Sequence, residues 1–252
     1  SDGMSPLQKQ QYYSVNSEMS DVTAQDSLKM LASHLSNYYG KNVIILLDEY
    51  DTPMQEAYIH GYWDEFTSFL RSMFNSTFKT NPYLERAVMT GITRVSKESM
   101  FSDLNNLNVV TTTSEEYSTS FGFTEDEVFS SLDKFGLPDR KEQVKQWYDG
   151  FTFGSQNDIY NPWSIINYLD KKQLKPYWAA TSSNGLVSKL LQTASSDMKL
   201  HMEELLRGDS IVVNFDEQIV FAQLDMDESA VWSLLVAGGY LKVDEVEYRG
   251  EI

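Results

Sequence analysis

The sequence predicts an α/β fold in the first half of the chain, followed by a mainly helical second half. Three observations predict it. Residues 43–47 are consecutive apolar residues, too few for a helix and too continuous for a half-exposed strand, which is typical of a strand buried on both faces. Residues 84–94 contain a second apolar run that ends in Thr-Gly. Helical spacing of apolar residues precedes and separates these runs, as in proteins built on a parallel sheet.

The elements of the first half have recognisable periods and boundaries. Residues 23–39 repeat apolar side chains every three or four positions and stop at Gly40, which predicts an amphipathic helix. A helix containing Met54 and Ala57 follows the first strand, and residues 62–79 form another that closes before Pro82. Residues 109–113 are β-rich and are expected to be the last strand of the sheet.

The pattern changes near residue 117, because strands and helices no longer alternate beyond it. We therefore predict two domains, 1–117 and 118–252. Helices are expected after the capping box Thr124 to Glu127, at residues 141–148, after the cap Asn161, before Gly208 and at residues 229–237. Strands are expected at residues 211–213, 219–221 and 239–248.

Aromatic residues crowd the segment 147–165, which brackets a turn-rich insert. Such rings could stack on an adenine or on a nucleic-acid base. The alternative is that they are core residues, which is favoured because bulky rings dominate packing wherever two elements meet.

Composition excludes several function classes. The chain has 252 residues and no cysteine, so disulfides, thiolate catalysis and cysteine-bound zinc are absent. The net charge of −17 repels phosphate backbones and disfavours non-specific binding of nucleic acid by this chain alone. No targeting segment or membrane-spanning run is apparent, so we expect a soluble, cytoplasmic protein with no membrane partner.

The first apolar strand ends in acid, at Asp48 and Glu49. Parallel strands deliver their last residues to the ligand-binding edge of the sheet. An apolar strand followed by Asp-Glu is the Walker B pattern of P-loop ATPases, in which the first acid holds Mg²⁺ and the second polarises the attacking water. The alternative is an acidic helix cap, with Asp51, Thr52 and Pro53 starting the next helix.

The second strand also ends in polar residues. In an ATPase, a side chain such as Thr90 at this edge senses the γ-phosphate, and a nearby cation such as Arg94 stabilises the transferring charge. The alternative is a strand that leads into a turn, with Arg94 in solvent.

Several ordered motifs resemble those of the predicted AAA-ATPase-like family of bacteria. The likeness covers the chain from about Ser27 to Tyr240. The motifs that carry it are VIILLDEYDTPMQEAY at 43–58, TGITRVSKESMFSDLNN at 90–106, WYDGFTFG at 147–154, IYNPWSI at 159–165 and YWAATSSNG at 177–185.

The resemblance implies a P-loop NTPase core with a winged-helix-like C-terminal region, fused in the parent protein to a PD-(D/E)XK nuclease domain. Its cofactors would be ATP and Mg²⁺. Asp48 matches the Mg²⁺-binding position, Glu49 the catalytic acid, and Thr90 with Arg94 the sensor segment. Nucleic acid would be reached only through the parent.

The chain departs from this family in two respects, since it has neither a phosphate-binding loop nor the nuclease domain. Its only Gly-Lys pair, Gly40-Lys41, is followed by Asn42 and preceded five positions earlier by Leu35, so GxxxxGK[ST] is not matched. We therefore interpret the chain as an internal part of a larger ATPase, inactive by itself.

Two alternatives remain from other function classes. A non-catalytic scaffold would have lost the phosphate loop by degeneration and would bind protein or DNA. A metal-dependent hydrolase would use Asp48, Glu49 and Asp51, although none of the three histidines lies near these acids in the sequence.

Overall fold

The structure, a computed structural model, describes residues 4–92, 104, 107–178, 185–215, 224, 227–245 and 247. It is a mixed α/β protein that divides into two compact units. The first comprises residues 1–107 with 218–226, and the second comprises residues 108–217 with 227–252. The predicted domain boundary after residue 117 remains a prediction.

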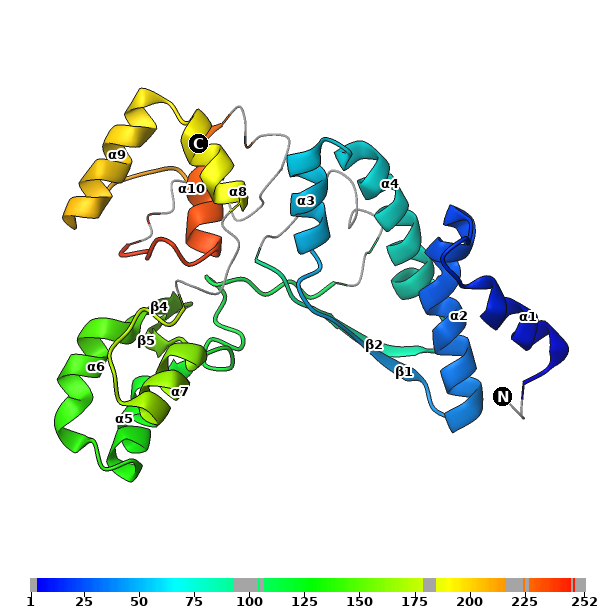
Figure 1. The fold of residues 1–252 in the computed structure, drawn as a ribbon, viewed down its shortest axis with the longest axis horizontal. Helices are drawn as coiled ribbons and strands as arrows, with labels where there is room; N and C mark the ends of the chain where they lie inside the picture. Colours follow the sequence, from blue (N-terminus) through cyan, green and yellow to red (C-terminus); the bar gives the residue numbers. More distant parts are fainter. Residues whose placement is uncertain are drawn as a thin grey trace. The chain divides into compact units, whose positions relative to one another are not determined.

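The first unit contains a two-stranded parallel sheet with helices (Figure 1). Its elements are α1 (Pro6–Ser14), α2 (Asp21–Tyr39), β1 (Val43–Leu47), α3 (Thr52–His60), α4 (Trp63–Phe74), the π-helical turn η1 (Asn75–Lys79) and β2 (Leu84–Met89). The predicted helices and the first two predicted strands of this half are confirmed, although the helix expected over residues 62–79 is α-helical only to Phe74 and continues as η1. Strands β1 and β2 pair in parallel, with Leu47 opposite Met89 at their carboxyl ends.

The local sequence explains where these elements begin and end. Ser20 caps α2 by accepting a hydrogen bond from the Thr23 amide, and Gly40 ends the helix in the left-handed conformation with φ of 64°. Gly61 ends α3 in the same way, with φ of 79°. The connection from β1 to β2 runs through the helices α3 and α4, because two parallel strands can be joined only by a long crossover.

The sequence prediction for the faces of β1 is wrong. The strand alternates between half-buried and exposed residues, with Ile44 61% and Leu46 76% exposed. Figure 1 shows α3 and α4 on the same side of β1 and β2. Only one face of the sheet is covered by the described elements of this unit.

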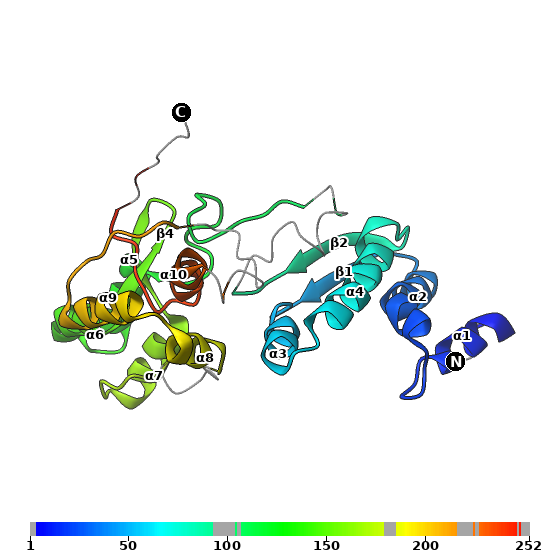
Figure 2. The ribbon, with the colours of Figure 1, turned by 90° about the horizontal axis from the view of Figure 1, so that it is seen from above.

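The second unit is built from helices (Figure 2) and a small antiparallel sheet of order β3-β5-β4. Its elements are β3 (Phe123–Thr124), α5 (Glu125–Lys134), the 3-10 turn η2 (Pro138–Arg140), α6 (Lys141–Tyr148), β4 (Asp149–Phe153), β5 (Gln156–Tyr160), α7 (Pro162–Lys171), α8 (Gly185–Thr193), α9 (Ser196–Arg207) and α10 (Glu228–Ala237). The expected helices are confirmed, including the capping box at Thr124 and the cap at Asn161.

The core of this unit is largely aromatic and aliphatic. Tyr148, Tyr160 and Tyr168 are buried with Val128, Leu132, Val144 and Ile165. The core interpretation of the aromatic segment is therefore correct for Tyr148 and Tyr160. Trp147 and Trp163 are half exposed.

Several predicted strands are absent from the described residues. Residues 109–113, 211–213 and 239–245 are irregular, because β-branched composition alone does not supply a pairing partner. The expected strand at 219–221 lies outside the described residues. Conversely, the segment read as a turn-rich insert forms the hairpin of β4 and β5.

Candidate functional site

The ends of β1 and β2 meet as parallel strands should. The Thr90 amide donates to the Leu47 carbonyl at 2.9 Å, and the Tyr50 amide donates to the Thr90 carbonyl at 3.0 Å. These two bonds continue the sheet by one step beyond each strand. They place the side chains of Asp48 and Thr90 at the same edge.

Asp48 and Thr90 are in direct contact. The Thr90 hydroxyl donates a short hydrogen bond to Oδ1 of Asp48, and the Glu49 amide donates to the same oxygen at 3.1 Å. Among the described residues, nothing donates to Oδ2 of Asp48. The carboxylate is exposed and oriented, with one oxygen available to a ligand such as hydrated Mg²⁺.

Glu49 adopts a backbone conformation that is unusual for its type. Its φ of 51° lies in the left-handed region, which costs a non-glycine residue about 1 to 2 kcal/mol. Its carbonyl accepts the Thr52 amide at 3.1 Å, closing a tight turn before α3. The side chain is exposed, and only a long contact of 3.5 Å joins Oε2 to the Thr52 hydroxyl. Strain of this kind is concentrated at functional sites.

Asp51 occupies the N-cap position of α3, as expected, but its side chain does not cap the helix. It is only 1% exposed. Oδ1 accepts the Ile92 amide at 3.4 Å, and Oδ2 accepts the Gln55 side chain at 3.4 Å. The carboxylate thus joins the turn after β1 to the loop after β2.

Gly91 allows the loop after β2 to lie this close to the turn after β1. A Cβ atom at residue 91 would lie 2.6 Å from Oδ1 of Asp51 and 2.7 Å from the ring of Tyr50. These separations are below van der Waals contact. The loop after β2 therefore requires glycine at this position for lack of space.

Not every predicted site residue can be placed. Arg94 lies outside the described residues. Gly40 and Lys41 end α2 and lead into β1, rather than preceding a helix whose amides could hold phosphate. The described residues include no group of three His, Cys, Asp or Glu side chains arranged to hold a metal ion, so the hydrolase built on Asp48, Glu49 and Asp51 gains no support.

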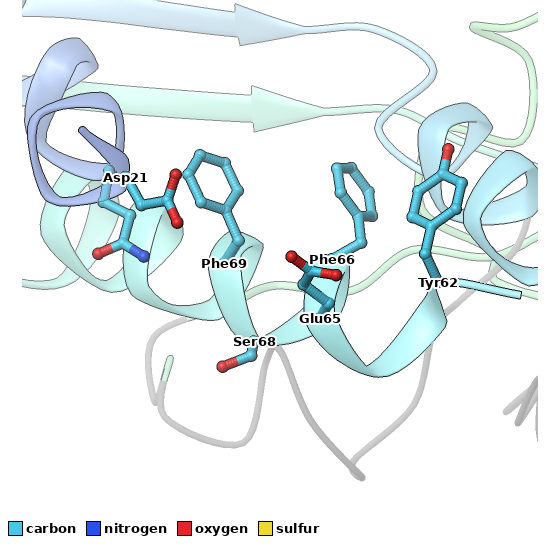
Figure 3. A pocket seen from close by; sticks show the side chains of 7 residues that line it. Asp21, Tyr62, Glu65, Phe66, Ser68 and Phe69 are labelled. Atoms are coloured by element: carbon cyan, nitrogen blue, oxygen red, sulfur yellow. The ribbon is translucent and has the colours of Figure 1, made fainter. Parts of the chain in front are cut away.

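A separate hollow lies between α2 and α4 (Figure 3). It has a volume of about 510 Å³. Phe66 and Phe69 of α4 project on the same side as Tyr62, which directly precedes the helix, and Asp21 lies at the start of α2. None of the predicted site residues lines it.

The second unit contains an ion network that sequence reasoning missed. Lys145 of α6 contacts Glu125 at 2.5 Å and Asp158 at 3.3 Å. The Tyr160 hydroxyl donates to Glu125 at 3.2 Å. The available signal was Gly154-Ser155, a two-residue loop between β-rich runs that is typical of a hairpin and brings Asp149 and Asp158 onto paired strands.

The pKa values of two carboxyl groups in this network are shifted in opposite directions. Burial raises the pKa of Asp149, and a hydrogen bond with Asp158 raises it further. Burial alone would raise the pKa of Asp158, but hydrogen bonds from Asp149 and Lys145 lower it. Lys242 also faces the pair. The pKa of Asp149 is thus raised and that of Asp158 lowered, chiefly because Asp149 is the more buried of the two and Asp158 is the one that contacts Lys145.

Asp149→Asn is expected to flatten the pH dependence of stability. Because the folded pKa of Asp149 is raised, its contribution is complete below the ordinary value and is lost as pH rises through the raised pKa. An amide donates to Asp158 at every pH. The variant should therefore gain about 1 kcal/mol on wild type, after solvent screening, as the pH rises from the ordinary pKa of an aspartate through the raised pKa of Asp149.

Thermal unfolding across this pH range measures the effect, with the exposed Asp170→Asn as the control. The control should follow the wild-type profile. If the unfolding temperatures of wild type and Asp149→Asn changed with pH in the same way, Asp149 would not have a raised pKa.

No helix among the described residues is both long enough and apolar enough to cross a bilayer.

Comparison with known proteins agrees with the family likeness of the motifs. Residues 4–101 match the family model AAA-ATPase_like, described as "Predicted AAA-ATPase". The chain is also similar to a protein of Azotobacter chroococcum mcd 1 named "Uncharacterized protein in vnfD 5'region", with 26% identity over 215 residues. The match covers 84% of this chain and 39% of that protein, so the chain spans about two fifths of the relative's length. No solved structure matches.

The matched segment contains both strands and the acidic edge, including Asp48, Glu49 and Thr90. Residues 4–101 of this chain therefore match the predicted AAA-ATPase family, in agreement with the resemblance of the sequence motifs.

Proposed function

We propose that this chain is part of an ATPase that binds and hydrolyses MgATP at the edge formed by Asp48, Glu49 and Thr90. The observation that carries the proposal is the meeting of Asp48 and Thr90, which are 42 residues apart in sequence and share a hydrogen bond at the carboxyl ends of parallel strands. Ligands bind at this edge in α/β proteins. The strained backbone of Glu49, beside that contact, supports a functional role for its side chain.

Each residue would have a distinct task. Asp48 would hold hydrated Mg²⁺ through Oδ2, while the Thr90 hydroxyl fixes the orientation of Oδ1. The exposed Glu49 carboxylate would orient the attacking water. Arg94 would stabilise charge on the transferring phosphate. Mg²⁺ bound there would supply positive charge to neutralise the phosphate oxygens.

The phosphate groups themselves need a cradle of backbone amides and a lysine, which the described residues lack. This part would come from elsewhere in a longer protein, in which hydrolysis would drive a conformational change in an attached nuclease domain. The length of the relative, of which this chain covers 39%, supports a longer protein.

For the second unit we propose a winged-helix-like arrangement. Helices α5 and α6 are followed by the β4–β5 hairpin, and the short strand β3 pairs with β5. Two helices followed by a hairpin that acts as a wing, with a short first strand beside it, is the pattern that supports this proposal.

The test is ATP turnover by the full-length protein and by this 252-residue chain, each with and without Mg²⁺. We expect Mg²⁺-dependent turnover by the full-length protein, lost in Asp48→Asn, and none by the chain alone. Turnover by the chain alone, sensitive to Asp48→Asn, would show that its phosphate site is complete. A full-length protein that neither binds nor hydrolyses ATP would favour the scaffold function instead.

A further inference from the structure

The hollow between α2 and α4 presents aromatic rings to solvent. The rings of Tyr62 and Phe66 form a corner, with centroids 6.1 Å apart and planes at 87° to each other. Phe69 projects on the same side of α4 (Figure 3). Tyr62 is 43% exposed, both phenylalanines are half-buried, and no residue that lines the hollow is fully buried. The hollow is therefore a surface groove, which we term the α2–α4 groove.

Two carboxylates, those of Asp21 and Glu65, line the same groove. Each lies in the first turn of its helix, where the helix dipole stabilises an acidic side chain, so their presence alone does not indicate a ligand. Within the described part of the chain, neither carboxylate forms an ion pair, and no Lys or Arg lines the groove. The described residues thus leave negative charge beside the rings without a cationic partner.

A cation that carries apolar groups is the chemical complement of this groove. Aromatic rings attract a cation placed over their faces, and a guanidinium group also stacks on them while it pairs with a carboxylate. The third ring, Phe69, provides apolar surface for a neighbouring aliphatic side chain. Small-molecule sites enclose most of the ligand's surface, whereas an open groove between helices suits a peptide segment.

We propose that the α2–α4 groove binds a basic segment of a partner protein. An Arg or Lys side chain of the partner occupies the corner of Tyr62 and Phe66, with Glu65 as its counter-ion, and an aliphatic neighbour packs on Phe69. The net charge of −17 attracts a basic partner and repels a second copy of the chain.

This inference goes beyond the proposed function, because none of the predicted site residues lines the groove. Its test measures peptide binding rather than ATP turnover, so either proposal can fail without the other.

The probe is a fluorescein-labelled peptide of about 12 residues in which Arg and Leu share one helical face. Fluorescence anisotropy measures its binding to the 252-residue chain in about 0.15 M salt, where exposed charges more than about 8 Å apart are largely screened. One comparison peptide carries citrulline in place of Arg, which keeps the shape and removes the charge. Another carries Ser in place of Leu. Both should bind at least about tenfold more weakly, because the groove needs both charge and apolar contact.

Glu65→Lys should weaken binding of the probe by about tenfold or more, because it removes the counter-ion and adds repulsion. Asp64→Lys is the matched control, since Asp64 is exposed in the same first turn of α4, does not line the groove and gives the same change in net charge. The control should weaken binding by less than about threefold.

Tyr62→Leu keeps apolar bulk but removes one ring, and it should weaken binding by about three- to tenfold. Tyr39→Leu is its control, because Tyr39 is 68% exposed at the end of α2 and lies outside the groove. In hydrogen exchange, the bound probe should slow the amides of α4 and leave those of α9 unchanged.

Four outcomes would overturn the proposal. The first is a probe that does not bind. The second is equal weakening by Glu65→Lys and Asp64→Lys, which would assign the attraction to net charge alone. The third is displacement of the probe by spermidine at an equal concentration, which would assign the groove to a small organic cation. The last is self-association of the chain that Glu65→Lys abolishes, which would assign the groove to a second copy.

Discussion

Glu49→Gln in the full-length protein is expected to leave MgATP binding largely intact and to lower ATP turnover by about two to four orders of magnitude. The amide keeps the shape and exposure of the side chain but cannot accept the proton of the attacking water. Asp48 keeps its hydrogen bond from Thr90, so the proposed metal position is unchanged.

Nucleotide binding and single-turnover hydrolysis, measured on the same preparation, separate these two effects. Glu56→Gln is the matched control, because Glu56 is an exposed residue of α3 that pairs with His60. The control should hydrolyse ATP at the wild-type rate. Unchanged turnover in Glu49→Gln would end the Walker B assignment.

Gly91→Ala is expected to destabilise the first unit by about 1 to 3 kcal/mol. The added methyl group would overlap Oδ1 of Asp51, which is buried, and the ring of Tyr50. Relief requires the loop after β2 to move away from the turn after β1. That movement should also weaken the contact between Thr90 and Asp48 and lower the ATP turnover of the full-length protein.

Gly150→Ala is the matched control for this substitution. Neither glycine has a positive φ, and a Cβ atom at residue 150 would have no neighbour within 4 Å. The control should therefore keep wild-type stability or gain a few tenths of a kcal/mol from a less flexible unfolded chain. Denaturant unfolding measures both variants, and equal stabilities would show that the loop can accommodate a side chain.

The candidate site was predictable in part. Acid directly after an apolar strand, and Thr-Gly after the next one, are local patterns, and the parallel geometry makes their meeting at one edge a reasonable expectation. The role of Asp51 was not predictable, since a carboxylate at a helix N-cap position normally bonds to the helix. Its bond to the Ile92 amide depends on how closely the two loops approach.

In the second unit, too, local features were predictable from the sequence and contacts between distant segments were not. Capping residues at Thr124 and Asn161 mark their helices correctly, because a cap bonds to an amide within its own turn. Residues 109–113 have the composition of a strand and are irregular, whereas the hairpin at Gly154-Ser155 was overlooked. Strand formation depends on a partner elsewhere in the chain, and composition does not identify that partner.

The sequence by itself determined the helix boundaries, the acidic strand ends and the family likeness of residues 4–101. Each of these depends on neighbours a few positions away along the chain. Only the tertiary structure decided that Thr90 binds Asp48, that Asp51 joins two loops, and that Ile44 and Leu46 lie in water. An apolar run indicates that a strand can be buried, but whether it is buried depends on which other segments pack against it.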